Sequence, residues 1–329
     1  MIADRRSALA LLVGALAAAR APSPARAADW APGRPMRMVV PYPAGGPTDA
    51  IARYVAQEMG AALGQQVVTE NLAGASGAVG TRAVARAEPD GLTIMLGNNQ
   101  THGNNMFLLK EPGYDAVKDF APLAGAGTFE HVFVVRNDLP AKTIPELVAL
   151  AKVEAGRLNY GSTGVGSGSH LSTELFMIRT GTKMTHVPFR GAAPLVQELI
   201  GGRIDLANST LPSILAQVQA GTIRAIGIAS PQRNPTLPEV ATLREQGVAN
   251  ADADSWTAFF APARTPAPIL DRLSRECLAA LNKPTVRDAL AKLGFTTKVR
   301  GPDEFRPYHA QEIATWGDII RTAEVKQEG

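Results

Sequence analysis

Two glycine-rich turns, one in each half of the chain, most constrain what it can fold into. Residues 36–49 and 157–170 each contain an apolar strand-like run, a turn rich in glycine and the start of a helix-like segment. A helix that begins at such a turn leaves backbone N–H groups pointing into open space, at the positive end of the helix dipole. The backbone alone can then bind an anion. Two such turns, far apart in sequence, predict two lobes that close on one small anion.

Strand-like and helix-like segments alternate along most of the chain. Apolar runs at 38–41, 67–70 and 92–96 are separated by helical patterns at 50–63 and 78–87. This βαβαβ start predicts a largely parallel sheet with helices on both faces. A second series follows, with strands expected at 131–135, 158–160, 184–189, 204–207 and 223–229 and helices at 143–155, 194–200 and 213–219.

The segment after residue 265 reads as mostly helical. Apolar side chains recur there at helical spacing, and we assign them to core packing: Phe305, Tyr308, Ile313, Trp316 and Ile320. Cys277 is the single cysteine, so an intramolecular disulfide is excluded. Its spacing from neighbouring leucines predicts a small buried core residue.

The first 27 residues predict export. Residues 7–19 form an apolar run after a short charged start, and Ala25-Arg26-Ala27 supplies an A-x-A cleavage pattern. The run is too short to span a bilayer, so a secretory signal peptide is expected, with a buried N-terminal helix as the alternative. We expect cleavage after Ala27, or after Ala28 as second choice.

Removing that segment changes the charge balance. It holds four of the 33 basic and one of the 30 acidic residues, which leaves 29 of each in residues 28–329. A neutral chain without a long basic block gives no support for binding to nucleic acid or a membrane surface. No later apolar run is long enough to span a membrane, and a length of about 300 residues allows two lobes.

An ordered set of motifs covers residues 28–329. With these motifs the chain resembles the Bug (Bordetella uptake gene) family of tripartite tricarboxylate transporter solute-binding receptors. The matching stretches are 41–53, 74–80, 88–91, 114–120, 158–171, 186–191, 233–239, 256–266 and 312–316. Phe189 and Arg190 depart from the family, where tyrosine and lysine are common. The amide-rich stretch 98–105 has no clear counterpart, so its part in binding is left open.

The resemblance implies a periplasmic-binding-protein fold of type II, with two α/β lobes and a ligand cleft between them. By analogy, residues 28–130 and 252–329 form lobe I and residues 131–251 form lobe II. The implied function is capture of a small carboxylate in the periplasm and its transfer to the membrane subunits of a tripartite tricarboxylate-type transporter, with the receptor acting as a monomer. Which carboxylate is bound stays open.

The two turns supply most of the expected ligand-binding residues. Neither turn contains Lys or Arg, so we expect capture mainly by backbone N–H groups at 44–46 and by the hydroxyls of Ser162 and Thr163. The full set expected at the ligand is Tyr42, Ala44, Gly45, Gly46, Asp49, Ser76, Ser162, Thr163, Gly164, Ser167, His170 and Asp205.

Four members of this set have alternative roles. Asp49 either faces the ligand or fixes the turn at 45–46 from the first turn of its helix. Ser76 either lines the cleft or caps a helix. His170 either lines the pocket, or faces solvent or caps its helix. Asp205, beside a strand-like run, is placed at the pocket only by the resemblance.

No metal or cofactor is expected. The histidines have no metal-ligand spacing, and the G-x-G-x-x-G and P-loop patterns are absent. One rival function is an exported α/β hydrolase that uses Ser162 or Ser167 with His170, although the G-x-S-x-G pattern is missing. A ligand-sensing input protein for a membrane kinase is a third possibility that shares the carboxylate site.

Overall fold

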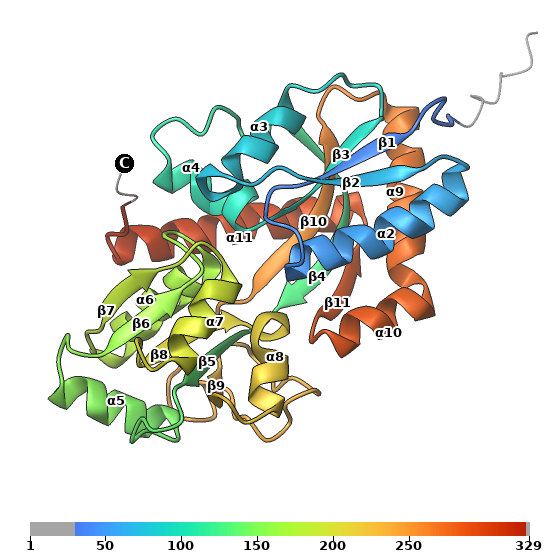
Figure 1. Ribbon diagram of the computed structural model, residues 1–329. Helices are drawn as coiled ribbons and strands as arrows, with labels where there is room; N and C mark the ends of the chain where they lie inside the picture. The colour runs from blue at the N-terminus through green and yellow to red at the C-terminus, as the bar shows by residue number, and fades with distance from the viewer. Residues whose placement is uncertain (1–29, 327–329) are drawn as a thin grey trace, which may run out of the picture. The chain divides into compact units, whose positions relative to one another are not determined.

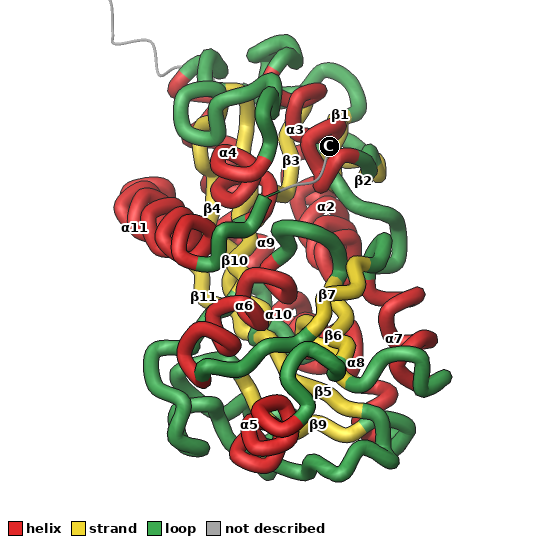
Figure 2. Tube along the Cα trace, turned by 90° about the vertical axis from the view of Figure 1, so that its left-hand side faces the viewer, coloured by secondary structure: helices red, strands yellow, loops and turns green. Residues whose placement is uncertain are grey.

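The structure is a computed structural model that describes residues 30–326. The signal peptide expected at 1–27 lies outside these residues. Two β-sheets flanked by helices organise the chain (Figure 1). The tube in Figure 2 shows the helices on the outer sides of the strands of both sheets.

The first sheet combines strands from both ends of the chain. Its strands are β1 (Met36–Val40), β2 (Val67–Asn71), β3 (Thr93–Asn98), β4 (Phe120–Phe129), β10 (Ser255–Pro262) and β11 (Thr296–Arg300), in the order β11-β4-β10-β3-β1-β2. The same chain segments form α2 (Pro47–Leu63), α3 (Ala78–Ala85), α4 (Asn105–Leu108), α9 (Ala267–Asn282), α10 (Pro284–Lys292) and α11 (Pro302–Thr322). Two short turns of helix, η1 (Ala75–Gly77) and η2 (Gln100–Asn104), complete this half.

This sheet is mixed rather than largely parallel. Strand β1 pairs in parallel with β2 and β3, as the βαβαβ pattern predicted. Strand β10 returns from the second half of the chain and lies antiparallel between β3 and β4, and β11 pairs antiparallel with β4. The expectation of a largely parallel sheet was therefore wrong, because a returning segment fills the centre of the sheet.

The second sheet has five strands. They are β5 (His131–Val135), β6 (Asn159–Ser162), β7 (Thr185–Pro188), β8 (Leu206–Thr210) and β9 (Arg224–Ile228), in the order β7-β6-β8-β5-β9. Strand β6 is parallel to β7 and β8, whereas β5 is antiparallel to β8 and β9. The helices of this half are α5 (Ile144–Val153), α6 (Gly168–Thr180), α7 (Ala192–Ile200) and α8 (Leu211–Gln219).

Two segments carry the chain between the sheets. Glu130 is the single residue between β4 and β5, and the stretch 229–254 leads from β9 back to β10. The first residues of the two strands entered in this way touch each other, because His131 Nε2 lies 2.8 Å from Ser255 Oγ. This contact fixes the place where both segments cross.

Local signals agree with these boundaries. Helix α2 has Pro47 in its first turn and ends at Gly64, whose left-handed conformation (φ 66°) suits glycine. Thr143 caps α5 by accepting a hydrogen bond from the Glu146 N–H at 3.3 Å, as expected from the sequence.

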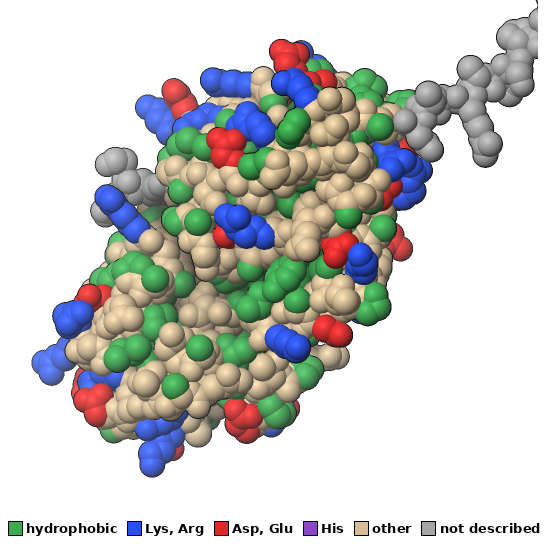
Figure 3. Space-filling view, turned by 45° about the vertical axis from the view of Figure 1, so that its right-hand side comes forward, with side chains coloured by type: hydrophobic (Ala, Val, Ile, Leu, Met, Phe, Trp, Pro, Cys, Tyr) green, Lys and Arg blue, Asp and Glu red, His purple; other side chains and the backbone are tan. Residues whose placement is uncertain are grey.

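The described residues also test the core assignments. Cys277 is fully buried on α9, and Phe305, Trp316 and Ile320 are buried on α11, so these core predictions are confirmed, whereas Tyr308 and Ile313 are only half-buried. None of the helices within residues 30–326 has the length and apolar character needed to cross a membrane. On the face drawn in Figure 3, basic and acidic side chains are interspersed and form no single-sign patch.

Candidate functional site

A cavity of about 550 Å³ lies against the starts of four helices, α2, α6, α7 and α8. The end of β3 supplies another wall through Asn98, Asn99 and Gln100, and the crossing segments contribute His131 and Ser255. No side chain caps the first turn of α2, α7 or α8. Helix starts of this kind carry unsatisfied N–H groups and a partial positive charge, so their dipoles add within the cavity.

The first glycine turn is held by Asp49. The Asp49 carboxylate accepts hydrogen bonds from Gly45 N–H at 3.0 Å, Arg53 Nε at 2.9 Å and Asn71 Nδ2 at 3.0 Å. Burial opposes its ionisation, but these bonds outweigh burial and lower the pKa of Asp49. Asp49 is part of the cavity lining, yet its carboxylate oxygens are already engaged, which matches the turn-fixing alternative.

One of the three backbone donors expected in this turn is already engaged. Gly45 N–H is occupied by Asp49, so it has no hydrogen to offer a ligand. The first intrahelical bond of α2 runs from Ala50 N–H to Gly46 O at 3.1 Å. The N–H groups of Thr48 and Asp49 therefore have no partner among the described residues, and they lie at the cavity. Ala44 and Gly46 also line it.

The second glycine turn brings three hydroxyl side chains together. Thr163, Ser167 and Ser169 line the cavity. Ser169 Oγ accepts a hydrogen bond from Thr163 N–H at 3.0 Å and lies 2.9 Å from Ser167 Oγ. Ser167 also caps α6 by accepting from His170 N–H at 3.2 Å. Sequence reasoning missed Ser169, although it sits between two predicted residues in the same turn.

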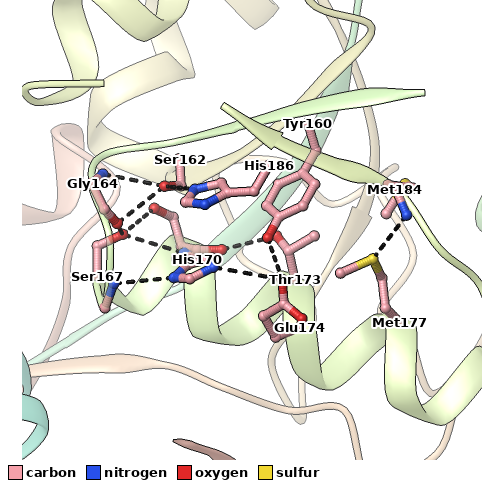
Figure 4. Close-up of polar contacts among 12 residues, drawn as sticks. Tyr160, Ser162, Gly164, Ser167, His170, Thr173, Glu174, Met177, Met184 and His186 are labelled. Carbon is pink, nitrogen blue, oxygen red and sulfur yellow. Dashed lines mark hydrogen bonds and ion pairs between the residues drawn. The ribbon is translucent and has the colours of Figure 1, made fainter. Parts of the chain in front are cut away.

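Ser162, Gly164 and His170 lie behind this turn and are not among the cavity-lining residues. His170 is buried and faces neither the cavity nor solvent, which leaves a capping role at the start of α6 among its expected alternatives. Its Nδ1 accepts a hydrogen bond from Gly166 N–H at 3.0 Å, while Ser162 Oγ lies 2.7 Å from His186 Nε2 (Figure 4). Ser162 and His170 are thus held by hydrogen bonds behind the turn rather than at the cavity.

Two further predicted residues are not brought to the cavity. Ser76 caps neither η1 nor α3, and its backbone carbonyl accepts from Asn105 Nδ2 at 3.0 Å. Asp205 precedes β8 and binds Arg136 Nε at 3.1 Å and Asn159 N–H at 2.8 Å. The cavity lies at the other end of β8, at Thr210, so Asp205 lies at the end of this strand that faces away from the cavity.

The amide-rich stretch, left open by the sequence, reaches the cavity. Tyr42 donates a hydrogen bond to Asn98 Oδ1 at 2.7 Å, and burial raises the pKa of the Tyr42 hydroxyl. Asn98 Oδ1 also accepts from Gln100 N–H at 3.1 Å, which starts the turn of η2. Asn99 and Gln100 are buried in the lining beside Tyr42. In the sequence, the only feature that pointed to Asn99 and Gln100 as cavity residues was their position directly after a predicted strand.

The starts of α7 and α8 form a wall that sequence reasoning missed. Arg190 is the only Lys or Arg side chain in the described lining, and it has no ion-pair partner among residues 30–326. It directly precedes Gly191, whose φ of 101° begins α7. Thr210, Pro212 and Ser213 of α8 lie in the same wall. The sequence feature that could have revealed this wall was Gly191, directly before α7.

Among the described residues, no group of three or more His, Cys, Asp or Glu side chains is arranged to hold a metal ion. The cavity instead offers helix dipoles, hydroxyls, amides and one guanidinium. Its single acidic side chain, Asp49, is neutralised locally by Arg53. Such a lining favours a small anion with hydrogen-bond acceptors.

Comparisons with known proteins agree with this chemistry. The family model described as "Tripartite tricarboxylate transporter family receptor" matches residues 51–325. The solved structure of the periplasmic binding protein BugD is 33% identical, with a TM-score of 0.83 over 90% of this chain and 100% of that one.

Two solved structures from Rhodopseudomonas palustris are also similar. Rpa4515 with adipate is 32% identical (TM-score 0.86, covering 91% of this chain and 100% of that one). MatC (Rpa3494) with bound malate is 33% identical (TM-score 0.81, covering 88% and 99%). These likenesses confirm the two-lobe fold of periplasmic binding proteins. The chain belongs to the tripartite tricarboxylate transporter receptor family.

Proposed function

We propose that this protein is an exported periplasmic receptor that binds a small dicarboxylate between two lobes and delivers it to the membrane subunits of a tripartite tricarboxylate-type transporter. The observation that carries the proposal is the convergence of four helix starts, three without side-chain caps, on one cavity. Adipate and malate, named with two similar structures, are both dicarboxylates.

The first carboxylate belongs at the two glycine turns. Its proposed donors are the N–H groups of Thr48 and Asp49 and the hydroxyls of Thr163 and Ser169. A single helix-dipole contact is worth about 0.3–1 kcal/mol, whereas micromolar binding needs about 8 kcal/mol. Several donors from both turns must therefore act on the ligand together.

The second carboxylate belongs at the wall formed by α7 and α8. Arg190 provides the cation there, and the uncapped first turn of α7 adds N–H donors. A guanidinium binds a carboxylate through paired hydrogen bonds, which a neutral end group cannot reproduce. With this placement, an acid group at both ends should bind better than a monocarboxylate.

The lobes are proposed to divide as residues 28–130 with 252–329 and residues 131–251. The ligand would contact both turns only when the lobes are closed, so binding stabilises the closed form. The closed surface is the state that the membrane subunits would recognise, with the receptor acting as a monomer.

The proposal assigns no catalytic role to the serines at this site. Ser162 is fully buried outside the cavity lining, so its contact with His186 is closed to a substrate. Ser167 Oγ binds Gly164 O at 2.7 Å, and the Nδ1 of His170 is occupied by Gly166 N–H. Ser167 thus has no free histidine that could take its proton, and Ser162, which has His186 beside it, is buried away from the cavity.

A thermal-shift screen tests the ligand class. Adipate, malate and their diamides are added to the purified protein before and after unfolding and refolding, which removes any retained ligand. A ligand at 100 times its dissociation constant should stabilise the fold by about 2.7 kcal/mol. We expect a shift with a diacid and none with its diamide. If no carboxylate in a broad panel shifted the melting temperature of the refolded protein, the proposal would be contradicted.

Gly46→Val should abolish binding without harming the fold. A side chain at Gly46 would meet only Pro43 O at 3.8 Å, so the fold tolerates it, but it would crowd the donors of Thr48 and Asp49. We expect at least about a tenfold loss of affinity, or 1.4 kcal/mol, by titration calorimetry. Gly301→Val is the matched control, because Gly301 precedes α11 with a similar conformation (φ −67°, ψ 169°) and no neighbour within 4 Å. Equal affinity of the two variants would remove this turn from the site.

A further inference from the structure

Two imidazole rings are stacked behind the second glycine turn. The rings of His170 and His186 lie 3.9 Å apart between centroids and are inclined by only 7°. His170 comes from the first turn of α6 and His186 from β7, and the Tyr160 ring of β6 stacks on His186 at 4.9 Å. Figure 4 shows the two histidine rings between the turn and Glu174.

Each ring is bonded to the turn through one nitrogen. Gly166 N–H donates to His170 Nδ1 at 3.0 Å, so this nitrogen carries no proton. His186 Nε2 lies 2.7 Å from Ser162 Oγ, which in turn accepts from Gly164 N–H at 3.2 Å. The rings thus reach the backbone at two glycines of the turn.

Those two glycines need such support. Gly164 (φ 135°) and Gly166 (φ 72°) both adopt conformations that other residues rarely enter. They have no side chains that could fix the turn, yet it carries Thr163 and Ser167 into the cavity lining. The shape of the cavity wall therefore depends on the hydrogen bonds made from behind.

The charged and titratable groups around the rings are Glu174 of α6 and Tyr160 of β6. Glu174 Oε1 accepts from the Tyr160 hydroxyl at 2.5 Å and lies 3.5 Å from His170 Nε2. Burial opposes ionisation of Glu174, but the bonds from His170 and Tyr160 outweigh it and lower its pKa. Burial, and then the neighbouring His170, lowers the pKa of His186 to about 4.

We propose that the stacked His170–His186 pair positions the ligand-facing turn through its hydrogen bonds to Gly166 and Ser162. Neither ring lines the cavity, so both are positioning residues. The inference rests on the proposed function of the cavity.

The first test needs no ligand. Hydrogen exchange of the Gly166 amide, followed by NMR, is compared in the wild type, His170→Phe and His170→Asn. Phenylalanine keeps the stacked ring but removes the acceptor, so the Gly166 amide should exchange about tenfold faster. Asparagine offers an acceptor in place of Nδ1 and should restore most of the protection. Unchanged exchange in His170→Phe would overturn the proposal.

The second test measures binding of adipate at pH 7.5. His170→Phe should bind about tenfold more weakly than the wild type, and His170→Asn should regain most of that loss. Equal affinity of His170→Phe and the wild type would refute the positioning role in binding.

Two controls separate the possible failures. His309→Asn, in the other half of the chain, alters a histidine bonded to His102 O and should leave the Gly166 amide unchanged. Ser162→Ala cuts the link from His186 to Gly164 and should expose the Gly164 amide, which provides a test if His170→Phe does not fold. A changed Gly166 amide in a protein that binds no carboxylate would refute the proposed function but leave the positioning role intact.

Discussion

At pH 7, Asp254→Asn should make the protein more stable by about 2–4 kcal/mol in the free energy of unfolding. Burial, followed by the charge of Glu130, raises the pKa of Asp254 to about 8. One carboxylate oxygen accepts from Ser230 Oγ at 3.0 Å, while the other is buried without a partner. At a pH where Asp254 is ionised in the unfolded chain, each unit by which its folded-state pKa is raised destabilises the folded protein by about 1.4 kcal/mol. Asparagine does not ionise, so the variant avoids this destabilisation.

The sign of the pH dependence follows from the raised pKa. In the wild type the folded state binds the Asp254 proton more tightly than the unfolded state does, so this contribution is fully present below about pH 4. It is lost as the pH rises towards 8. The gain in Asp254→Asn should therefore be largest near pH 8 and disappear below pH 4.

Urea unfolding at pH 4 and pH 7.5 measures this difference. Asp303→Asn is the matched control, because Asp303 on α11 is 99% exposed and pairs only with Arg306 on the surface. Its effect should stay within about 0.5 kcal/mol at either pH. A lower stability of Asp254→Asn at pH 7.5 would mean that the buried carboxylate has a stabilising partner.

Gly127→Ala should destabilise the protein by at least about 3 kcal/mol. Gly127 of β4 has φ 151°, and a Cβ there would lie 2.1 Å from Thr296 O and 2.8 Å from Lys298 N. Both contacts are with backbone atoms of β11, so no side-chain rotation can relieve them. Backbone strain and overpacking each cost about 1–3 kcal/mol.

The measurement is again chemical denaturation, with Gly33→Ala as the control. A Cβ at Gly33 would meet no atom within 4 Å, and the backbone there is not left-handed. We expect no more than about 0.5 kcal/mol of change there. Equal unfolding midpoints for the two variants would show that β11 can move away from β4 at little cost.

The elements that alternate regularly were predictable, whereas β4, β10 and β11 of the first sheet were not. The run 131–135 coincides with β5, and the helical pattern at 213–219 lies within α8. Strand β10 was missed because Ser255–Pro262, all buried, alternates polar and apolar residues only over its first four positions, which is too short to mark a strand. Strand β11 lies within a segment expected to be mostly helical.

The same limit applies to the candidate site. Glycine turns followed by helices are visible in a sequence, and the structure brings both turns to one cavity. The sequence does not show which N–H groups of the turns are free to bind a ligand. That depends on which of them are already hydrogen-bonded within the protein, as Gly45 N–H is to Asp49. Arg190 and Gln100 reach the cavity through the packing of elements distant in sequence, which one sequence does not report.

The antiparallel entry of β10 has a consequence for how the chain assembles during synthesis. Strands β3 and β4 each pair with β10, which begins at Ser255, more than one hundred residues after β4 ends at Phe129. The six-stranded sheet therefore cannot be completed until the five-stranded sheet has left the ribosome. Long-range pairing of this kind slows folding. The edges of β3 and β4 stay open in the nascent chain until then, which leaves them available to a chaperone.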